Sequence, residues 1–171
     1  MAKVPKDLNL RMMKSDDRPA SLKEPSRFPL ESGKKFLVVI LGPTAVGKTA
    51  LSIEVAKGLE TEIISADSRQ FFKEMNIGTS KPNAEELISV KHHFINSISV
   101  EEEYNVGMFE RDALNSLKNI FNTKNAAVMA GGSGLYIHAV CNGFDEVPQA
   151  DKETRANLTE MYKQEGIEYL R

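Results

Sequence analysis

The chain has 171 residues, of which 41% are hydrophobic and 27% charged, enough for one globular domain with a buried core. Its net charge of −2 argues against a strongly basic nucleic-acid coat protein. A single cysteine, Cys141, excludes an internal disulfide framework and fits the cytoplasm; we expect it to be a small buried residue on a helix. No segment approaches the ~18 apolar residues of a membrane span, so no membrane association is expected.

Residues 1–35 are polar and contain four prolines. They carry nine Lys or Arg and five Asp or Glu, whereas residues 36–171 carry 13 and 19. The five acidic residues within 1–35, and the lack of an apolar core in this segment, argue against a secretory signal or a transit peptide. We expect a flexible leader, with a basic arm for RNA as the alternative.

The most informative segment begins at residue 36. Six apolar residues, 36–41, predict a buried strand, and GPTAVGKT from Gly42 to Thr49 matches the phosphate-loop pattern G-x-x-x-x-G-K-[ST]. A helix is expected at 48–59. Its N-terminus and the loop N–H groups would surround an anion, Lys48 adds a full charge, and the Thr49 hydroxyl is placed to hold Mg²⁺. This context disfavours an ordinary glycine turn.

A second informative segment follows a strand expected at 62–65. It reads ADSRQ, from Ala66 to Gln70. Because it lies one crossover from the phosphate loop, Asp67 should lie near the bound anion, where it could position magnesium or accept a proton. Arg69 could reach a phosphate, and Gln70 a base edge. Asp-Ser-Arg is also a common turn, and that interpretation stays open.

Helical and extended patterns alternate along the rest of the chain. We expect helices at 83–90, 106–122 and 135–141, an extended segment at 92–95 and a strand at 126–130. This order predicts an α/β fold, a parallel sheet like that of phosphate-loop NTPases with helices on both faces. Right-handed crossovers would bring the phosphate loop and the 66–70 turn to one edge of the sheet.

Three further features carry weaker signals. His92 and His93 are adjacent, so on a strand they would point to opposite faces, and each is most simply packed or hydrogen-bonded. Phe71 and Phe109 are expected in the core. Three glycines between 131 and 134 allow a backbone or a ligand to approach closely, and the Ser133 hydroxyl could cap the next helix or bind a substrate.

After Pro148 the sequence becomes charged and helical. Asp151 could cap this helix, with Leu158 and Tyr162 among its candidate core contacts. No aspartate follows the strand at 126–130, where many phosphate-loop ATPases hold magnesium, so a simple ATP hydrolase is disfavoured.

Five motifs in this order resemble the tRNA dimethylallyltransferase family, the tRNA isopentenyltransferases. The motifs are Gly42–Thr49, Ser65–Gln70, Ile77–Pro82, His92–His93 and Gly131–Tyr136. The resemblance runs from about residue 36 to 158, and residues 147–155 resemble the start of the family's helical insertion. It implies a catalytic core at 36–148 and, at 149–171, the truncated beginning of a helical tRNA-binding insertion. The family usually has threonine at the position of Ser133, and serine retains the hydroxyl group of that threonine.

The resemblance implies transfer of a dimethylallyl group from dimethylallyl diphosphate to N6 of an adenine beside the tRNA anticodon, by a cytoplasmic monomer. The phosphate- or nucleotide-binding residues would be Gly42, Pro43, Thr44, Ala45, Val46, Gly47, Lys48 and Thr49, with Thr49 also a ligand of Mg²⁺. Asp67, Lys48 and Thr44 would be catalytic, Asp67 as the base. The tRNA contacts would be Asp67, Ser68, Arg69, Gln70 and Ser133.

Two alternatives remain open. One is an enzyme with another substrate: a prenyltransferase of free adenine nucleotides, or a small-molecule kinase. The other is a fragment that binds a diphosphate or a nucleotide without turnover. The family's further diphosphate-binding arginine and most of its insertion would lie beyond Arg171, so we expect a partial chain.

Overall fold

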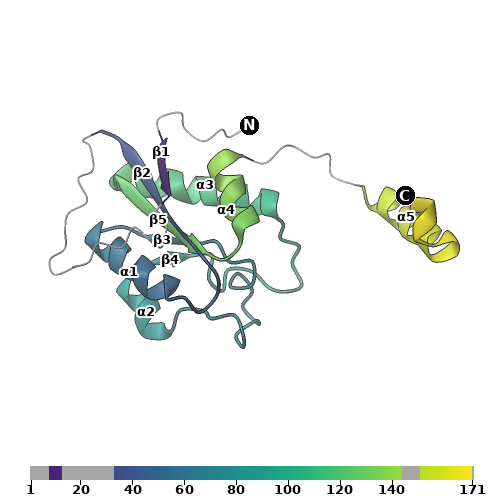
Figure 1. Ribbon diagram of the computed structural model, residues 1–171, viewed down its shortest axis with the longest axis horizontal. Helices are drawn as coiled ribbons and strands as arrows, with labels where there is room; N and C mark the ends of the chain where they lie inside the picture. Colours follow the sequence, from purple (N-terminus) through teal and green to yellow (C-terminus); the bar gives the residue numbers. More distant parts are fainter. Residues whose placement is uncertain (1–7, 13–32, 144–150, 171) are drawn as a thin grey trace.

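The computed structural model describes residues 8–12, 33–143 and 151–170, and within them the strands form one parallel sheet (Figure 1). The sheet order is β1-β2-β5-β3-β4. The strands are β1 (Leu8–Met12), β2 (Lys35–Leu41), β3 (Ile63–Ser65), β4 (His92–His93) and β5 (Ala126–Gly131). The helices are α1 (Lys48–Gly58), α2 (Ala84–Ser89), α3 (Val106–Thr123), α4 (Gly134–Asn142) and α5 (Lys152–Glu165), followed by a 3₁₀ turn at Ile167–Leu170.

Helices cover both faces of the sheet, as predicted, because the buried strands are apolar on both sides. Leu37, Ile64 and Met129 pack with α3 and α4 on one face. Their strand neighbours Ile63 and Val128 pack with α1 on the other. Successive residues of one strand therefore point to opposite faces of the sheet and pack in different hydrophobic clusters.

The prediction of a flexible leader at residues 1–35 is wrong for residues 8–12. This segment forms β1 and pairs in parallel with residues 35–39 of β2. Its sequence, LNLRM, alternates apolar and polar residues, which is typical of a strand. The added strand also covers the backbone edge that β2 would otherwise leave unpaired. Residues 1–7 and 13–32 lie outside the described part of the chain.

The predicted elements between 36 and 141 are confirmed within one or two residues, apart from the extended segment at 92–95, of which only His92 and His93 form a strand. The helical segment expected at 151–171 is shorter, since α5 ends at Glu165. The cap predicted at Asp151 is present, since its side chain accepts from the backbone N–H of Thr154 at 2.7 Å. The prediction that Leu158 and Tyr162 make core contacts is wrong, because about half of each is exposed in the described structure.

An aromatic cluster fixes the segment that follows β3. Phe71 is buried, with its ring centroid 5.4 Å from that of Phe109 on α3 and 5.6 Å from that of Tyr136 on α4. Both phenylalanines therefore belong to the core, as predicted. Since Phe71 lies only four residues after Asp67, this packing holds the Asp67 turn at the sheet edge. Among the described residues, no helix is long and apolar enough to cross a membrane.

Candidate active site at the carboxyl edge of the sheet

A cavity of about 310 Å³ lies beside the carboxyl ends of β2, β3 and β5. Its wall combines the phosphate loop with segments distant in sequence. The lining residues are Thr44, Ala45, Gly47, Lys48, Thr49, Ser52, Ile63, Ser65, Asp67, Gln70, Ser80, Pro82, His92, Ala130 and Gly131. The cavity thus brings together the phosphate loop and the 66–70 turn, as the sequence predicts, and adds Gly131 from the glycine-rich turn.

The phosphate loop has the backbone shape of an anion site. Ala45 and Gly47 adopt left-handed conformations, with φ of 67° and 88°, which turn backbone N–H groups inward. Helix α1 begins at Lys48 without a side-chain cap and without an acidic residue in its first turn. Its first N–H groups and the positive end of its dipole are therefore available to a bound anion.

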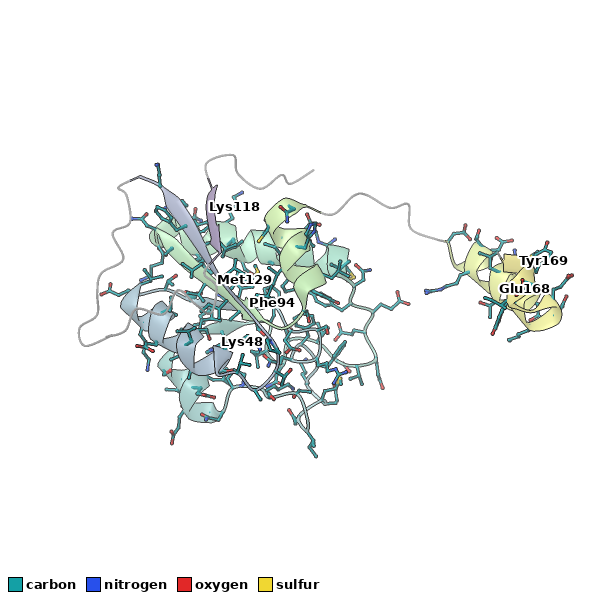
Figure 2. The ribbon with its side chains drawn as sticks, in the orientation of Figure 1. Lys48, Phe94, Lys118, Met129, Glu168 and Tyr169 are labelled. Atoms are coloured by element: carbon teal, nitrogen blue, oxygen red, sulfur yellow. The ribbon has the colours of Figure 1, made fainter. Side chains whose placement is uncertain are left out.

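Lys48 lies at the start of α1 (Figure 2). Its Nζ donates to the carbonyl of Pro43 at 2.6 Å, so the ammonium group lies across the loop. Of the eight residues predicted to bind phosphate, five line the cavity, and Gly42, Pro43 and Val46 do not. These three still shape the turn that carries the others.

Asp67 is half-buried at the cavity, where a hydrogen bond between its side chain and the backbone two residues later holds it in place. Its Oδ1 accepts from the backbone N–H of Arg69 at 3.0 Å. The turn interpretation and the functional one are therefore compatible: the carboxylate shapes the turn and also faces the cavity. Ser68 and Arg69 follow it but do not line the cavity, and Arg69 is exposed.

Ser133 ties the glycine-rich turn to the Asp67 turn. Its Oγ accepts from the backbone N–H of Ser68 at 3.0 Å, and its own N–H donates to the carbonyl of Ala66 at 3.1 Å. The proposed helix cap is wrong, since Ser133 precedes α4 without a side-chain capping bond.

Gln70 bridges two walls of the cavity. Its Oε1 accepts from Ser65 Oγ at 2.9 Å, while its amide nitrogen donates to the carbonyls of Thr79 and Ser80, each at 3.1 Å. The amide group is thus engaged on both sides, which holds the segment containing Ser80 and Pro82 against β3. In this arrangement Gln70 shapes the cavity.

Four further lining residues, Ser65, Ser80, Pro82 and His92, lie in motifs of the family resemblance, but the sequence assigned them no role at a cavity, and Ser52 lies in no such motif. Ser65 carries one signal of its own, because a hydroxyl inside a buried, otherwise apolar strand needs a partner. His92 and His93 do point to opposite faces. His93 Nε2 lies 2.6 Å from Glu62 Oε2, while His92 lines the cavity on the α1 side.

The cavity residues fit a magnesium ion bound mainly by a phosphate ligand and water. Within the described ranges, no group of three or more His, Cys, Asp or Glu side chains could enclose a metal. The cavity does present the Thr49 hydroxyl and the Asp67 carboxylate. Magnesium is commonly held by one or two such oxygens, by substrate phosphates and by several waters.

Comparison with protein families decides the affiliation of the chain. Residues 70–171, more than half of the sequence, match the family described as IPP transferase. The chain belongs to the IPP transferase family. The matched region includes Gln70, His92 and the glycine-rich turn. Gln70, His92 and Gly131 line the same cavity as the phosphate loop.

Two curated relatives of this IPP transferase family chain are named tRNA dimethylallyltransferase. The "tRNA dimethylallyltransferase" of Christiangramia forsetii is 55% identical over 135 residues, covering 79% of this chain and 45% of the relative. That of Flavobacterium johnsoniae is 52% identical over 136 residues, covering 80% and 44%. The chain therefore spans less than half the length of these curated relatives.

Solved structures of the same family share the fold. The tRNA isopentenylpyrophosphate transferase of Bacillus halodurans superposes with a TM-score of 0.64 at 38% identity, covering 80% of this chain and 46% of that one. A eukaryotic dimethylallyltransferase acting on tRNA gives a TM-score of 0.64 at 32% identity, covering 73% and 31%. Both likenesses support the α/β sheet as the family's architecture.

Proposed function

We propose that this chain forms the diphosphate-binding catalytic core of a tRNA dimethylallyltransferase. The whole enzyme would transfer a dimethylallyl group from dimethylallyl diphosphate to N6 of an adenine next to the tRNA anticodon. One observation carries the proposal: the phosphate loop and the Asp67 carboxylate line the same cavity. An anion cradle beside a proton acceptor is what transfer to a weakly nucleophilic amine needs.

The reaction forms one C–N bond and breaks one C–O bond. The N6 lone pair attacks C1 of the dimethylallyl group, and the electron pair of the C1–O bond leaves with the diphosphate. Asp67 accepts the proton that the amine loses. The N–H groups of the phosphate loop, Lys48 and the Thr44 hydroxyl stabilise the negative charge on the leaving group.

Bound magnesium would neutralise part of the diphosphate charge, with Thr49 as its protein ligand. The adenine must leave its base stack to reach a cavity of this size. Arg69 is exposed beside the cavity, where its guanidinium can contact an RNA phosphate. Ser68 and Ser133 join the two turns at the cavity, and Gln70 holds the segment that contains Ser80.

Product analysis with isotopically labelled dimethylallyl diphosphate and magnesium tests the function. Unmodified tRNA, free adenine nucleotides and ATP with small acceptors are supplied in separate reactions. Label in tRNA supports the proposal. Label only in free nucleotides makes the chain a nucleotide prenyltransferase, and phosphorylation of an acceptor by ATP makes it a kinase.

A binding measurement separates the enzyme from a binding fragment. Titration with dimethylallyl diphosphate gives the affinity before tRNA is added. Saturable binding with no transfer to tRNA would make this chain a diphosphate-binding fragment. That outcome has physical grounds, since the relatives contain more than twice as much sequence as the matched region.

A further inference from the structure

One buried ring nitrogen stands out at the cavity. Of the buried side-chain nitrogen and oxygen atoms in the described part of the chain, Nε2 of His92 is the one without a hydrogen-bond partner. A buried polar atom without a partner costs about 1–3 kcal/mol. His92 lines the same cavity as the phosphate loop, so its missing partner can come from a bound ligand.

The other ring nitrogen determines what kind of partner Nε2 needs. Nδ1 lies 2.8 Å from the carbonyl oxygen of Val90. A carbonyl can only accept, so Nδ1 carries the proton and donates it. In the neutral ring, Nε2 is then a bare acceptor. Burial lowers the pKa of His92, outweighing the opposing effects of the Val90 bond and Glu86, which keeps the ring neutral near pH 7.

The position of His92 narrows the choice of donor. His92 pairs in register with Ile63, which packs on the α1 face of the sheet. Thr49 and Ser52 lie on α1 and line the same cavity. The Nε2 acceptor thus belongs to the layer of the cavity that contains the Thr49 hydroxyl, the proposed magnesium ligand.

The chemistry of the expected ligands excludes most direct partners. A diphosphate offers acceptors, which Nε2 cannot bond. The amide nitrogen of Gln70 is already engaged with two carbonyls, and the Lys48 ammonium donates to Pro43 and is assigned to the diphosphate by the proposed function. Water bound to a hard cation is a strong donor, and magnesium keeps several such waters.

We propose that His92 is a positioning residue whose Nε2 accepts a hydrogen bond from a water ligand of a divalent cation bound together with a diphosphate. This inference deepens the proposed function and rests on it for the identity of the anion. It assigns to His92 an outer-sphere contact, in which the imidazole orients the cation's water and makes no direct bond to the metal.

Calorimetric titration of the full chain with Mg²⁺ at saturating inorganic pyrophosphate tests the assignment. His92→Leu should weaken Mg²⁺ binding by about tenfold, the effect of one strong hydrogen bond. His92→Gln offers an amide oxygen as the acceptor and should stay within about threefold of the parent. The control is His138→Leu on the exposed face of α4, which should leave the affinity unchanged.

A spectroscopic readout keeps the test independent of turnover. In ¹⁵N-labelled protein, the Nε2 resonance of His92 should shift on addition of Mg²⁺ with pyrophosphate and stay in place with pyrophosphate alone. His92→Leu removes an unpaired acceptor together with the Nδ1 bond to Val90, and because these two changes oppose each other, we expect it to fold normally. A folded His92→Leu protein with unchanged Mg²⁺ affinity overturns the inference.

The two proposals fail in distinguishable ways. If no dimethylallyl group is transferred but Mg²⁺ binding depends on His92, the proposed function fails and the cation contact stands. If transfer occurs while His92→Leu weakens binding of an adenine nucleotide and leaves Mg²⁺ binding intact, the donor is the base, and the cation assignment is wrong.

Discussion

The backbone of Ala66 packs directly against Gly131, so closely that a side chain at position 131 has no room. A Cβ placed on Gly131 would lie 3.0 Å from the Cα of Ala66 and would overlap its carbonyl group. The N–H of Ala66 also donates to the carbonyl of Ala130 at 2.8 Å. This contact joins the ends of β3 and β5 and positions Asp67 one residue further on.

Gly131→Ala should therefore separate the two turns and destabilise the protein by about 3 kcal/mol, since backbone atoms on both sides must move. Urea denaturation measures the loss. The matched control is Gly134→Ala, because nothing lies within 4 Å of a Cβ at Gly134. At the start of α4, alanine should be neutral or stabilise by up to ~1 kcal/mol. Equal effects of the two substitutions would contradict the close contact.

Asp67→Asn tests the proposed base without removing the turn. The asparagine Oδ1 can still accept from the N–H of Arg69, so the loop should keep its shape. We expect kcat for transfer to tRNA to fall by about 10²–10⁴-fold, with little change in pyrophosphate affinity or melting temperature. The measurement is single-turnover kinetics, in the whole enzyme if this chain alone does not turn over. Turnover near that of the parent would exclude Asp67 as the base.

Glu62 should make stability depend on pH. Burial alone would raise the pKa of Glu62, but the hydrogen bond from His93 at 2.6 Å and the Lys91 ammonium at 3.1 Å outweigh it, and the pKa lies below its usual 4.5. A depressed folded-state pKa means that the stabilisation is complete above pH 4.5 and is lost as the pH falls further.

Glu62→Gln should cost about 1 kcal/mol at neutral pH, and this difference should shrink near pH 3. Urea unfolding of both proteins at the two pH values gives the comparison. Glu54→Gln is the control, since Glu54 is exposed on α1 and its neutralisation should change little at either pH. A Glu62→Gln difference that is the same at both pH values would refute the linkage.

Lys81 holds the loop that carries Ser80 and Pro82 into the cavity. Its Nζ donates to the carbonyl of Phe72 at 2.7 Å, to Asn76 Oδ1 at 3.1 Å and to Asn96 Oδ1 at 2.6 Å. All three donor positions of the ammonium group are thus used within the protein.

Lys81→Met should leave these acceptors without their donor and destabilise the protein by about 2 kcal/mol. Pyrophosphate binding should also weaken, because the loop forms part of the cavity wall. Thermal denaturation and pyrophosphate titration measure the two effects. The exposed Lys73→Met is the control and should stay within ~0.5 kcal/mol of the parent. If the two variants behaved alike, Lys81 would not hold the loop.

Local chemistry explains why the phosphate loop was predictable. The run from Gly42 to Thr49 specifies its own turn and the start of α1, so both could be located without knowledge of their neighbours. The same holds for the cap at Asp151, which satisfies backbone N–H groups within one turn.

Features that depend on distant partners were less predictable. β1 could not be recognised because a five-residue alternating segment becomes a strand only when an edge such as that of β2 accepts it. The role of Ser133 had the same difficulty: its hydroxyl bonds Ser68, 65 residues away, whereas the sequence suggested the nearer helix or a substrate as its partner.

The sequence by itself determined the phosphate loop, the alternation of strands and helices and the candidate base at Asp67, since each depends on residues that are neighbours in the chain. Only the tertiary structure decided that His92 lines the cavity, that Gln70 holds two segments of its wall together by hydrogen bonds, and that position 131 has no room for a side chain. Those properties arise where separate strands end side by side, and a pattern along one chain does not contain the distances between them.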